Sequence, residues 1–487
     1  MNLGYFAPEL ILAVTAIAVI LLDLFIERKG GELTVVSLAG IIIAAASIFV
    51  IPVSPNQAIF NNMLAVDNFA FFFKLLFLVI VALVILASTD YASRFEHFRG
   101  EYYALLLISA LGMMLMAATR ELISIYISLE LASISLYALS GFLKDKKSSE
   151  ASLKYLLLGA LSSAVLLYGM ALVFGVTGQT HLDKIAFVVQ HISPSAVSDN
   201  PALVLGIVLL LAGFGFKIAA FPFQMWVPDV YEGAPTPVVA YLSVGSKAAG
   251  FAVILRVFYS AFSAPDWLAA NWGAIFAVLA AIGMFVGNLS ALPQTNIKRM
   301  LGYSSIAQAG YLMVGLAALG AAPWAPVLGQ SGVLFFLASY SLANLGAFAA
   351  IIAISNKVGS DNIDDFSGMI KRAPALTLAL SLCLISLIGM PPAAGFMAKF
   401  YIFSGAVHSG LLWLVILAVI NSVISAYYYL RVVKVMWFGE PKSEEKVPSS
   451  GALRLALIIS SLGVLVIGIA PGPVIDFART AASMLGF

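Results

Sequence analysis

Long apolar runs recur from one end of the chain to the other, separated by short polar connections. Each run has roughly 18–25 residues, the length that a helix needs to cross the hydrocarbon core of a bilayer. The pattern predicts an all-α polytopic membrane protein with about 14 transmembrane helices. The expected spans are about 5–26, 33–52, 69–89, 102–119, 122–143, 150–176, 202–224, 237–260, 267–290, 300–319, 328–354, 374–402, 409–437 and 452–471.

The connections between these runs are too short for a soluble domain. The two longest are expected as polar loops at about 178–201 and 438–451. The first run, from Tyr5 to about Phe25, is long enough to span and lacks a basic region before it. It is therefore interpreted as a retained helix rather than a cleaved signal peptide.

Composition supports a lipid environment, because 62% of the residues are hydrophobic and only 10% are charged. Soluble domains average about 25% charged residues, so this much apolar surface needs lipid around it. A net charge of +2 spread over many loops gives no basis for binding nucleic acid. The single cysteine, Cys383, excludes an intrachain disulfide and a cysteine-held iron–sulfur cluster.

Basic residues are distributed unequally when the loops are assigned to alternating sides. One side holds Arg120, Lys184, Arg256 and Arg479. The positive-inside rule makes the richer side cytoplasmic and places both termini on the outer, periplasmic side. The richer side holds Arg28, Lys29, Arg94, Arg99, Lys144, Lys146, Lys147, Lys298, Arg299, Lys357, Lys371, Arg372, Arg431, Lys434, Lys442, Lys446 and Arg454.

Five lysines lie inside apolar runs, and one acid, Glu130, falls near the middle of a span. A charge in hydrocarbon costs at least ~2.5–3.5 kcal/mol, and such residues usually mark ion or proton pathways. No pair of histidines, no GxGxxG after a strand and no P-loop suggests a haem, nicotinamide, ATP or metal site in this chain. The five lysines are Lys74, Lys154, Lys217, Lys247 and Lys399, and the four histidines are His97, His181, His191 and His408.

Structural alternatives carry different weight for each lysine. Lys74 lies about one turn inside its helix and is expected to snorkel to the interface, and Lys154 can do so with more difficulty. Lys217, Lys247 and Lys399 lie deeper, so a transport role is favoured over a purely structural ion pair. Glu130 needs a cationic partner; Lys154, on the next helix, is the expected one, directly or through a bridging water.

Two of the lysine-bearing helices, the seventh and the twelfth, contain breaking prolines. Pro222 follows Lys217 by five residues, and Pro391 and Pro392 precede Lys399. Proline removes a backbone donor, and a break at membrane depth is tolerated where protein or water lines the site.

The spacing of the two broken helices predicts a repeat, because a shift of five helices reverses direction through the membrane. We expect two inverted five-helix repeats, helices 4–8 and 9–13. The predicted segments are 1–100 (three N-terminal helices), 101–260 (first repeat), 261–437 (second repeat) and 438–487 (a loop and the last helix).

These features resemble the antiporter-like membrane subunits of respiratory complex I, and among them subunit N. The resemblance covers essentially the whole chain. Its most specific piece is FPFQMWVPDVYEGAPTPV after Lys217, followed by SLELASISLYAL around Glu130, KRMLGYSSIAQAGY from Lys298 and GMPPAAGFMAKFY around Lys399. Lysine at 399 resembles subunits N and L rather than M, and the chain lacks the long C-terminal lateral helix typical of L.

The resemblance implies a proton-translocating subunit without a redox centre of its own, in a bacterial inner membrane. NADH, FMN, iron–sulfur clusters and quinone would be bound by partner subunits, and subunit M and small membrane subunits would be neighbours. Glu130 and Lys154 would form a coupling pair, Lys217 the central proton-holding group, Lys247 the link between half-channels, and Lys399 the terminal lysine.

One position departs from the family pattern. Gln224 replaces a common histidine and can orient water but not titrate.

Two alternatives remain open at this point. A subunit of a multisubunit cation/proton antiporter shares the ancestry and would show sodium-dependent exchange without quinone chemistry. A purely structural spacer between neighbouring pumps would leave the five buried lysines without a purpose.

Overall fold

The computed structural model describes residues 3–25, 31–51, 57–92, 98–191, 200–321 and 326–483 of the 487-residue chain. Within these ranges, 13 helices are long and apolar enough to cross a membrane. The expected twelfth span is present as two shorter helices that meet at a break. The prediction of a polytopic helical membrane protein is confirmed. Arg28, Lys29, Arg94 and His97 lie outside the described residues.

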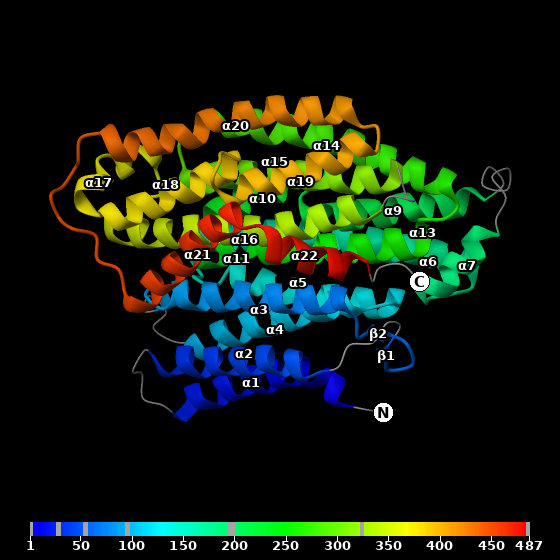
Figure 1. Cartoon of the computed structure of the whole chain (residues 1–487). Helices are drawn as coiled ribbons and strands as arrows, with labels where there is room; N and C mark the ends of the chain where they lie inside the picture. The colour runs from blue at the N-terminus through cyan, green and yellow to red at the C-terminus, as the bar shows by residue number, and fades with distance from the viewer. Residues whose placement is uncertain are drawn as a thin grey trace.

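The N-terminal helices form an outer layer of the bundle. α1 and α2 pack on each other, and α1 also packs on α4 (Arg99–Ala118), so this pair covers one side of the molecule (Figure 1). A short hairpin follows, with Ala58 paired to Ala65. The elements before α4 are η1 (Leu3–Phe6), α1 (Ala7–Phe25), α2 (Glu32–Val50), β1 (Ala58–Ile59), β2 (Leu64–Ala65) and α3 (Asn68–Ser88).

The next group of helices contains the first break. After α9 the chain is irregular for seven residues before α10 begins, and the following span changes between α and π geometry. The elements are α5 (Leu122–Ser140), α6 (Lys146–Thr177), α7 (Leu182–Gln190), α9 (Pro201–Ile218), α10 (Trp226–Gly233), α11 (Thr236–Tyr241), η3 (Leu242–Ser246), α12 (Lys247–Ile254), η4 (Leu255–Tyr259) and α13 (Ser260–Phe262).

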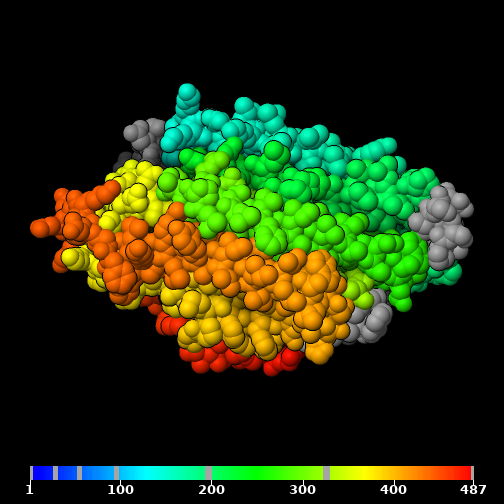
Figure 2. Space-filling model, turned by 90° about the horizontal axis from the view of Figure 1, so that it is seen from above, coloured from blue at the N-terminus to red at the C-terminus, as the bar shows by residue number. Residues whose placement is uncertain are grey.

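The remaining helices contain the second break, between α18 and α19. α20 lies on the surface beside α14 (Figure 2), and the last helices return toward α3 and α16. The elements are α14 (Asp266–Ala291), α15 (Ile297–Ala321), α16 (Pro326–Val358), η5 (Ile363–Phe366), α17 (Met369–Arg372), α18 (Pro374–Ile388), α19 (Ala394–His408), α20 (Leu412–Phe438), α21 (Gly451–Ile469) and α22 (Gly472–Ala482).

Polar caps fix where several helices begin. The Asp67 side chain accepts from the backbone N–H of Ala70 at 2.8 Å at the start of α3. Glu121, Asp145 and Ser450 cap α5, α6 and α21 in the same way. Side-chain oxygens at this position satisfy backbone donors that a helix leaves unpaired at its first turn.

Burial divides the spans into an inner and an outer set. The span from Thr236 to Phe262 is buried along its whole length, and α15 and α16 nearly so, whereas α1, α2, α6 and α21 leave about two-thirds of their residues at the surface. Apolar residues on those exposed faces suit lipid or partner helices. The inner helices are the ones that hold Lys247 and its surroundings.

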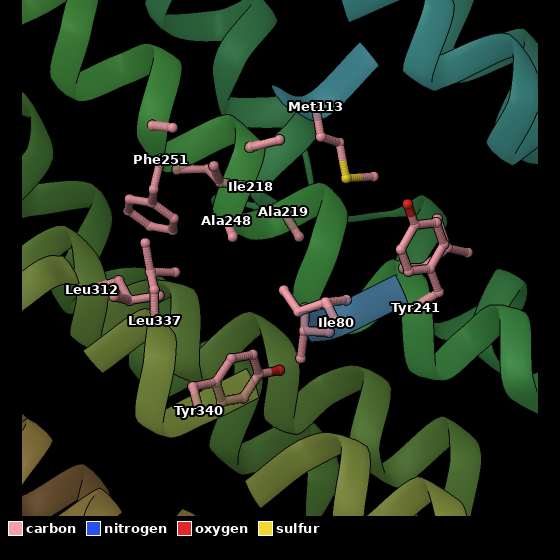
Figure 3. Close-up of a cluster of buried hydrophobic side chains, with 14 of the residues drawn as sticks. Ile80, Met113, Ile218, Ala219, Tyr241, Ala248, Phe251, Leu312, Leu337 and Tyr340 are labelled. Carbon is pink, nitrogen blue, oxygen red and sulfur yellow. The ribbon is translucent and has the colours of Figure 1, made fainter. Parts of the chain in front are cut away.

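An apolar cluster fills the space where the first break meets the inner helices (Figure 3). Ile218 and Ala219 from the end of α9 lie near Ala248 and Phe251 of α12. Leu312 of α15 and Leu337 of α16 close the cluster from the other side. Closely packed apolar side chains leave no polar partner for water, so this cluster is expected to be dry.

Two short helices differ from the sequence-based expectation. The connection expected as a loop at 178–201 contains α7, and a further helix, α22, follows the last span. Both are short amphipathic helices of 9 and 11 residues. Neither is long enough to give a membrane-span pattern in sequence, so both were missed.

Candidate functional site

Lys217 stands in the last turn of α9, immediately before the first break. α9 ends at Ile218, and Pro222, which cannot donate a backbone hydrogen bond, lies in the irregular stretch that follows. The Lys217 side chain is buried and donates to the Ser133 hydroxyl on α5. Its ammonium lies 5.6 Å from the centre of the Tyr137 ring. α5 therefore supplies both neutral contacts of this cation.

Glu130 lies in the middle of α5, one turn before Ser133, so it shares a face with the Lys217 contact. Its carboxylate accepts a hydrogen bond from Ser163 of α6. It is also within electrostatic range of Lys217. The half-buried Glu130 and Lys217 thus belong to one cluster built by α5, α6 and α9.

Lys154 and Glu130, the expected pair, make no direct contact, and a link between them through a bridging water stays a prediction. Lys154 pairs with Glu150 at 2.9 Å on its own helix and with Asp229 of α10 at 2.8 Å. Its side chain is 44% exposed, so it sits at the edge of the bundle rather than beside Glu130. The sequence suggested Glu130 of the neighbouring helix as the partner of Lys154, but Asp229, which follows the first break, lies closer to Lys154.

Asp229 connects Lys154 to a second helix. Arg299 of α15 donates to Asp229 at 2.8 Å and to Glu232 at 2.9 Å. Charged side chains of α6, α10 and α15 therefore form one partly exposed network beside α10, the helix that follows the first break. Asp229 and Glu232 belong to the VPDVYEGAP stretch that follows the break at Pro222, and two acids beside a proline break were the signal that could have found them.

Lys247 opens α12, directly after the π-helical segment η3. Its ammonium donates to the Ser305 hydroxyl of α15 at 2.7 Å and to the Ser305 carbonyl. The Tyr340 ring lies 5.6 Å away. The Ser305 hydroxyl also contacts Tyr231 at 3.1 Å and Tyr340 at 3.3 Å.

Gly250 brings Lys247 and Lys217 onto touching helices. A Cβ at Gly250 would lie 2.6 Å from Ile218 and 3.4 Å from the Lys217 Cβ. The absence of a side chain is therefore what lets α12 approach the end of α9. Gly250 follows Lys247 by one turn, so the two lysines come from adjacent turns of contacting helices.

Lys399 lies in α19, past the second break. α18 ends at Ile388, and the exposed Pro391 and Pro392 occupy the interruption before α19. The buried Lys399 ammonium donates to the Ile388 carbonyl at 2.7 Å and to the Ser422 hydroxyl of α20 at 3.0 Å. It also lies 4.2 Å from the centre of the Tyr311 ring of α15.

Gly389 makes room for this lysine. Its φ of +92° is one that other residues rarely adopt, and a Cβ there would lie 2.8 Å from the Lys399 side chain. The turn after α18 is thereby shaped around the lysine. An apolar groove of about 780 Å³ opens beside it, lined by α19 and α20 residues such as Phe400 and Val423.

The three central lysines share one kind of environment. Each is buried, and its recorded hydrogen bonds go to serine hydroxyls or backbone carbonyls and its ring contact to a tyrosine. Tyrosine faces attract cations without carrying a charge. Serines and tyrosines in apolar helices gave no distinct signal in the sequence, so these partners were missed: Ser133, Ser163, Ser305, Tyr311 and Ser422.

Other buried cations have charged partners. Lys74 pairs with Glu9 of α1 at 2.6 Å, so the expectation that it snorkels to the interface is wrong. Arg256 pairs with Asp67 at 2.6 Å and also donates to the Ala117 carbonyl, and Arg120 lies 3.5 Å from the same carboxylate. Among the described residues, no group of three or more His, Cys, Asp or Glu is arranged to hold a metal ion.

Comparisons with known proteins bear on this arrangement of lysines. The family model described as NADH:quinone oxidoreductase/Mrp antiporter, transmembrane, matches residues 118–425. The NADH-quinone oxidoreductase subunit N of Dehalococcoides mccartyi is 48% identical over 481 residues, covering 99% of each chain. The chain belongs to the subunit N family.

Solved structures extend this family assignment to three dimensions. A chain of respiratory complex I from Thermus thermophilus, solved with bound aureothin, matches this subunit N homologue with a TM-score of 0.79. It is 34% identical, and the match covers 96% of this chain and 98% of that one. A chain of the Mrp complex from a Dietzia species matches with a TM-score of 0.85 at 20% identity. The match covers 100% of this chain and 98% of that one, which shows a shared fold.

Proposed function

We propose that this chain is the proton-translocating membrane subunit N of an H⁺-translocating NADH:quinone oxidoreductase. It carries protons through Glu130, Lys217, Lys247 and Lys399, while electrons flow in other subunits. The observation that carries the proposal is the central row of buried lysines whose hydrogen-bond partners are neutral. The two broken helices and the contact between α9 and α12 bring this row together.

Neutral partners suit a lysine that must change its charge. When Lys247 or Lys399 releases its proton, no carboxylate among its hydrogen-bond partners is left without a counter-charge, which is the costly outcome for an ion pair. Lys217 differs, because Glu130 lies within electrostatic range of it. Moving a proton across 100 mV costs about 2.3 kcal/mol. A hydrogen bond to a charged group contributes about 1.5–3 kcal/mol, so rearranging one or two such bonds is energetically sufficient.

Lys154 and Gln224 are assigned supporting roles in this proposal. Lys154 lies in the partly exposed charge network with Asp229, where a charge change in a neighbouring subunit can reach the first break. The Gln224 side-chain oxygen is buried and has no hydrogen-bond partner among the described residues. A free acceptor in the break suits a water molecule, which Gln224 would orient.

The assembly around this subunit follows from the same proposal. NADH, FMN, iron–sulfur clusters and quinone are held by partner subunits. The antiporter-like subunit M and small membrane subunits are the neighbours, in a bacterial inner membrane with both termini on the periplasmic side. Helices 4–8 and 9–13 form inverted repeats; in support, α4 packs on α5 as α14 packs on α15.

The test is a joint measurement of proton pumping and quinone reduction in membranes that carry the intact complex. Lys217→Ala and Glu130→Gln are expected to lower both activities together, because electron transfer is coupled to the relay. The matched control is Lys184→Ala, an exposed lysine on α7 that is expected to leave both unchanged. Full pumping by the Lys217→Ala complex would sink the proposal and favour a structural spacer.

A cation/proton antiporter subunit is the second candidate, favoured by the family model that spans both classes and by the shared fold of the Mrp complex. It predicts sodium-dependent proton exchange that proceeds without quinone reduction. Absence of sodium-dependent exchange from vesicles that reduce quinone and pump protons would exclude it.

A further inference from the structure

A buried cluster of tyrosines and asparagines separates Lys399 from Lys247. It is built by α14, α15 and α20, and its central members are completely buried. Ser304, the sequence neighbour of the Lys247 partner Ser305, hydrogen-bonds to Tyr429. The cluster ends at Ser422, which contacts Lys399. The members between these ends are Tyr429, Tyr428, Asn288, Asn421 and Tyr311.

Hydroxyl groups lead into the cluster from both ends, but an amide stands in the middle. The Tyr428 and Tyr429 rings lie 4.4 Å apart, and the Tyr428 hydroxyl donates to the Asn288 Oδ1 at 2.9 Å. On the other side, the Asn288 Nδ2 donates to the Tyr311 hydroxyl at 3.2 Å. The Tyr311 ring lies 4.2 Å from the Lys399 ammonium, which also donates to Ser422.

The orientation of the Asn288 amide is dictated by its surroundings. Its Nδ2 faces the Asn421 backbone carbonyl at 3.2 Å, and a carbonyl only accepts. It also faces the Asn421 Oδ1 at 3.1 Å, and Asn421 is itself oriented because its Nδ2 donates to the Leu417 carbonyl at 3.0 Å. Asn288 therefore presents its oxygen to Tyr428 and its nitrogen to Tyr311.

This orientation fixes the hydrogens of the neighbouring hydroxyls. Tyr428 donates toward Asn288, and Tyr311 accepts from Asn288, so the Tyr311 hydroxyl hydrogen points away from the amide. Ser422 donates to the Ala418 carbonyl at 3.0 Å and accepts from Lys399. No hydroxyl hydrogen on this side points back toward Lys247.

A hydroxyl can pass a proton by accepting one and releasing another, but a side-chain amide does not titrate. The geometry points to Asn288, held by Asn421, as a proton-blocking residue between Lys247 and Lys399. It lies between Ser304, the sequence neighbour of the Lys247 partner Ser305, and Tyr311, whose ring faces the Lys399 ammonium, and it prevents passive proton flow between the two lysines. This inference rests on the proposed function, because a block matters only if the lysines carry protons.

The experiment measures passive proton leak in vesicles reconstituted with the intact complex, without substrate and under an imposed potential. Asn288→Ser replaces the amide with a hydroxyl, and Asn288→Asp replaces it with a titratable group of the same shape. Both are expected to raise the leak by roughly tenfold or more, since a positioned proton-transfer group typically contributes about 10²–10⁴-fold. If both variants stay as tight as the wild type, the inference is overturned.

A second substitution shows whether the leak runs through this cluster. Tyr428→Phe removes the hydroxyl that faces residue 288, so the Asn288→Ser/Tyr428→Phe double variant is expected to be tight again. A leak that persists in the double variant arises from general loosening and also overturns the inference. Lys217→Ala in the same vesicles separates the two proposals. If the Lys217→Ala complex loses pumping while the Asn288 variants show no added leak, the proton block at Asn288 is rejected and the proposed function stands.

Discussion

Two groups of buried cations coexist in this bundle and differ in their partners. Lys217, Lys247 and Lys399 in the centre meet hydroxyls, carbonyls and tyrosine rings. Lys74 and Arg256, at the packing of α3 with its neighbours, each meet a buried carboxylate. A buried charge with a carboxylate partner is held in its charged state, whereas one with neutral partners can lose its proton without leaving a counter-charge. Burial alone therefore does not distinguish the lysines proposed to carry protons from structural cations; the partners of each group do.

Removal of Arg256 should give the largest loss of stability. Arg256→Met leaves the buried Asp67 with Arg120, 3.5 Å away, as its remaining cationic partner, and breaking a buried pair costs about 3–5 kcal/mol. The thermal unfolding of the complex and its yield in membranes should both fall, while the pumping per assembled complex stays close to that of the wild type. Arg479→Met, at an exposed pair, serves as the control. An Arg256→Met complex of normal stability that no longer pumps would place Arg256 with the central lysines.

The Lys74–Glu9 pair offers a sharper test of the structural role of a buried ion pair, because both partners can be replaced together. Lys74→Met alone strands Glu9 and should cost about 3 kcal/mol. The Glu9→Leu/Lys74→Met double variant replaces the pair with apolar side chains of similar volume, which is often neutral, and should regain most of the stability. Thermal unfolding of the two single variants and the double variant measures this coupling. Recovery of stability together with lost pumping would contradict a purely structural role.

The two helix breaks differ in how they satisfy the end of the first half-helix. At the second break, Lys399 itself donates to the last carbonyl of α18. At the first break, Lys217 points to Ser133 instead, and the Phe216 carbonyl, two residues before the end of α9, accepts from the Trp226 indole and the Ala219 N–H. A change of charge at Lys399 is therefore linked to the geometry of its break, and one at Lys217 is not.

Replacing Lys399 tests this link. Lys399→Met should abolish coupled pumping and also weaken the end of α18, because a cation at a helix C-terminus contributes up to about 2 kcal/mol in a buried setting. Lys399→Arg keeps a donor for Ile388 but holds its charge, so it should protect the break and still fail to pump. The measurement is amide hydrogen exchange of residues 385–396 in the Lys399 variants, compared with that of residues 215–226 in Lys217→Met. An equal rise in hydrogen exchange at both breaks would contradict the proposed difference between Lys399 and Lys217.

The sequence predicted the spans and the breaks because their causes are local. Length of an apolar run sets a span, and Pro222, Pro391 and Pro392 interrupt the backbone ladder wherever they stand. The family assignment followed from the stretches around Glu130 and Lys399.

Partner choice is not local, and there the sequence failed. Glu9 lies 65 positions before Lys74, and Asp229 75 positions after Lys154, so nothing in sequence order pairs them. Serine and tyrosine partners are also silent in sequence, because a hydroxyl on an apolar helix more often bonds to its own backbone. Ser133 does this toward Leu129 as well as accepting from Lys217.

The smallest predicted effect lies at the first break. Trp226→Phe removes the indole N–H that donates to the Phe216 carbonyl at 3.1 Å, but keeps a ring to stack on Tyr155, 4.5 Å away. The loss should be about 1 kcal/mol, because the Ala219 N–H still serves that carbonyl. Pumping should persist, since Lys217 does not cap α9, and a small fall in thermal stability is the measured outcome. If Trp226→Phe instead stops pumping as fully as Lys217→Met, the cap and the charge are linked at this break too, and the two breaks work alike.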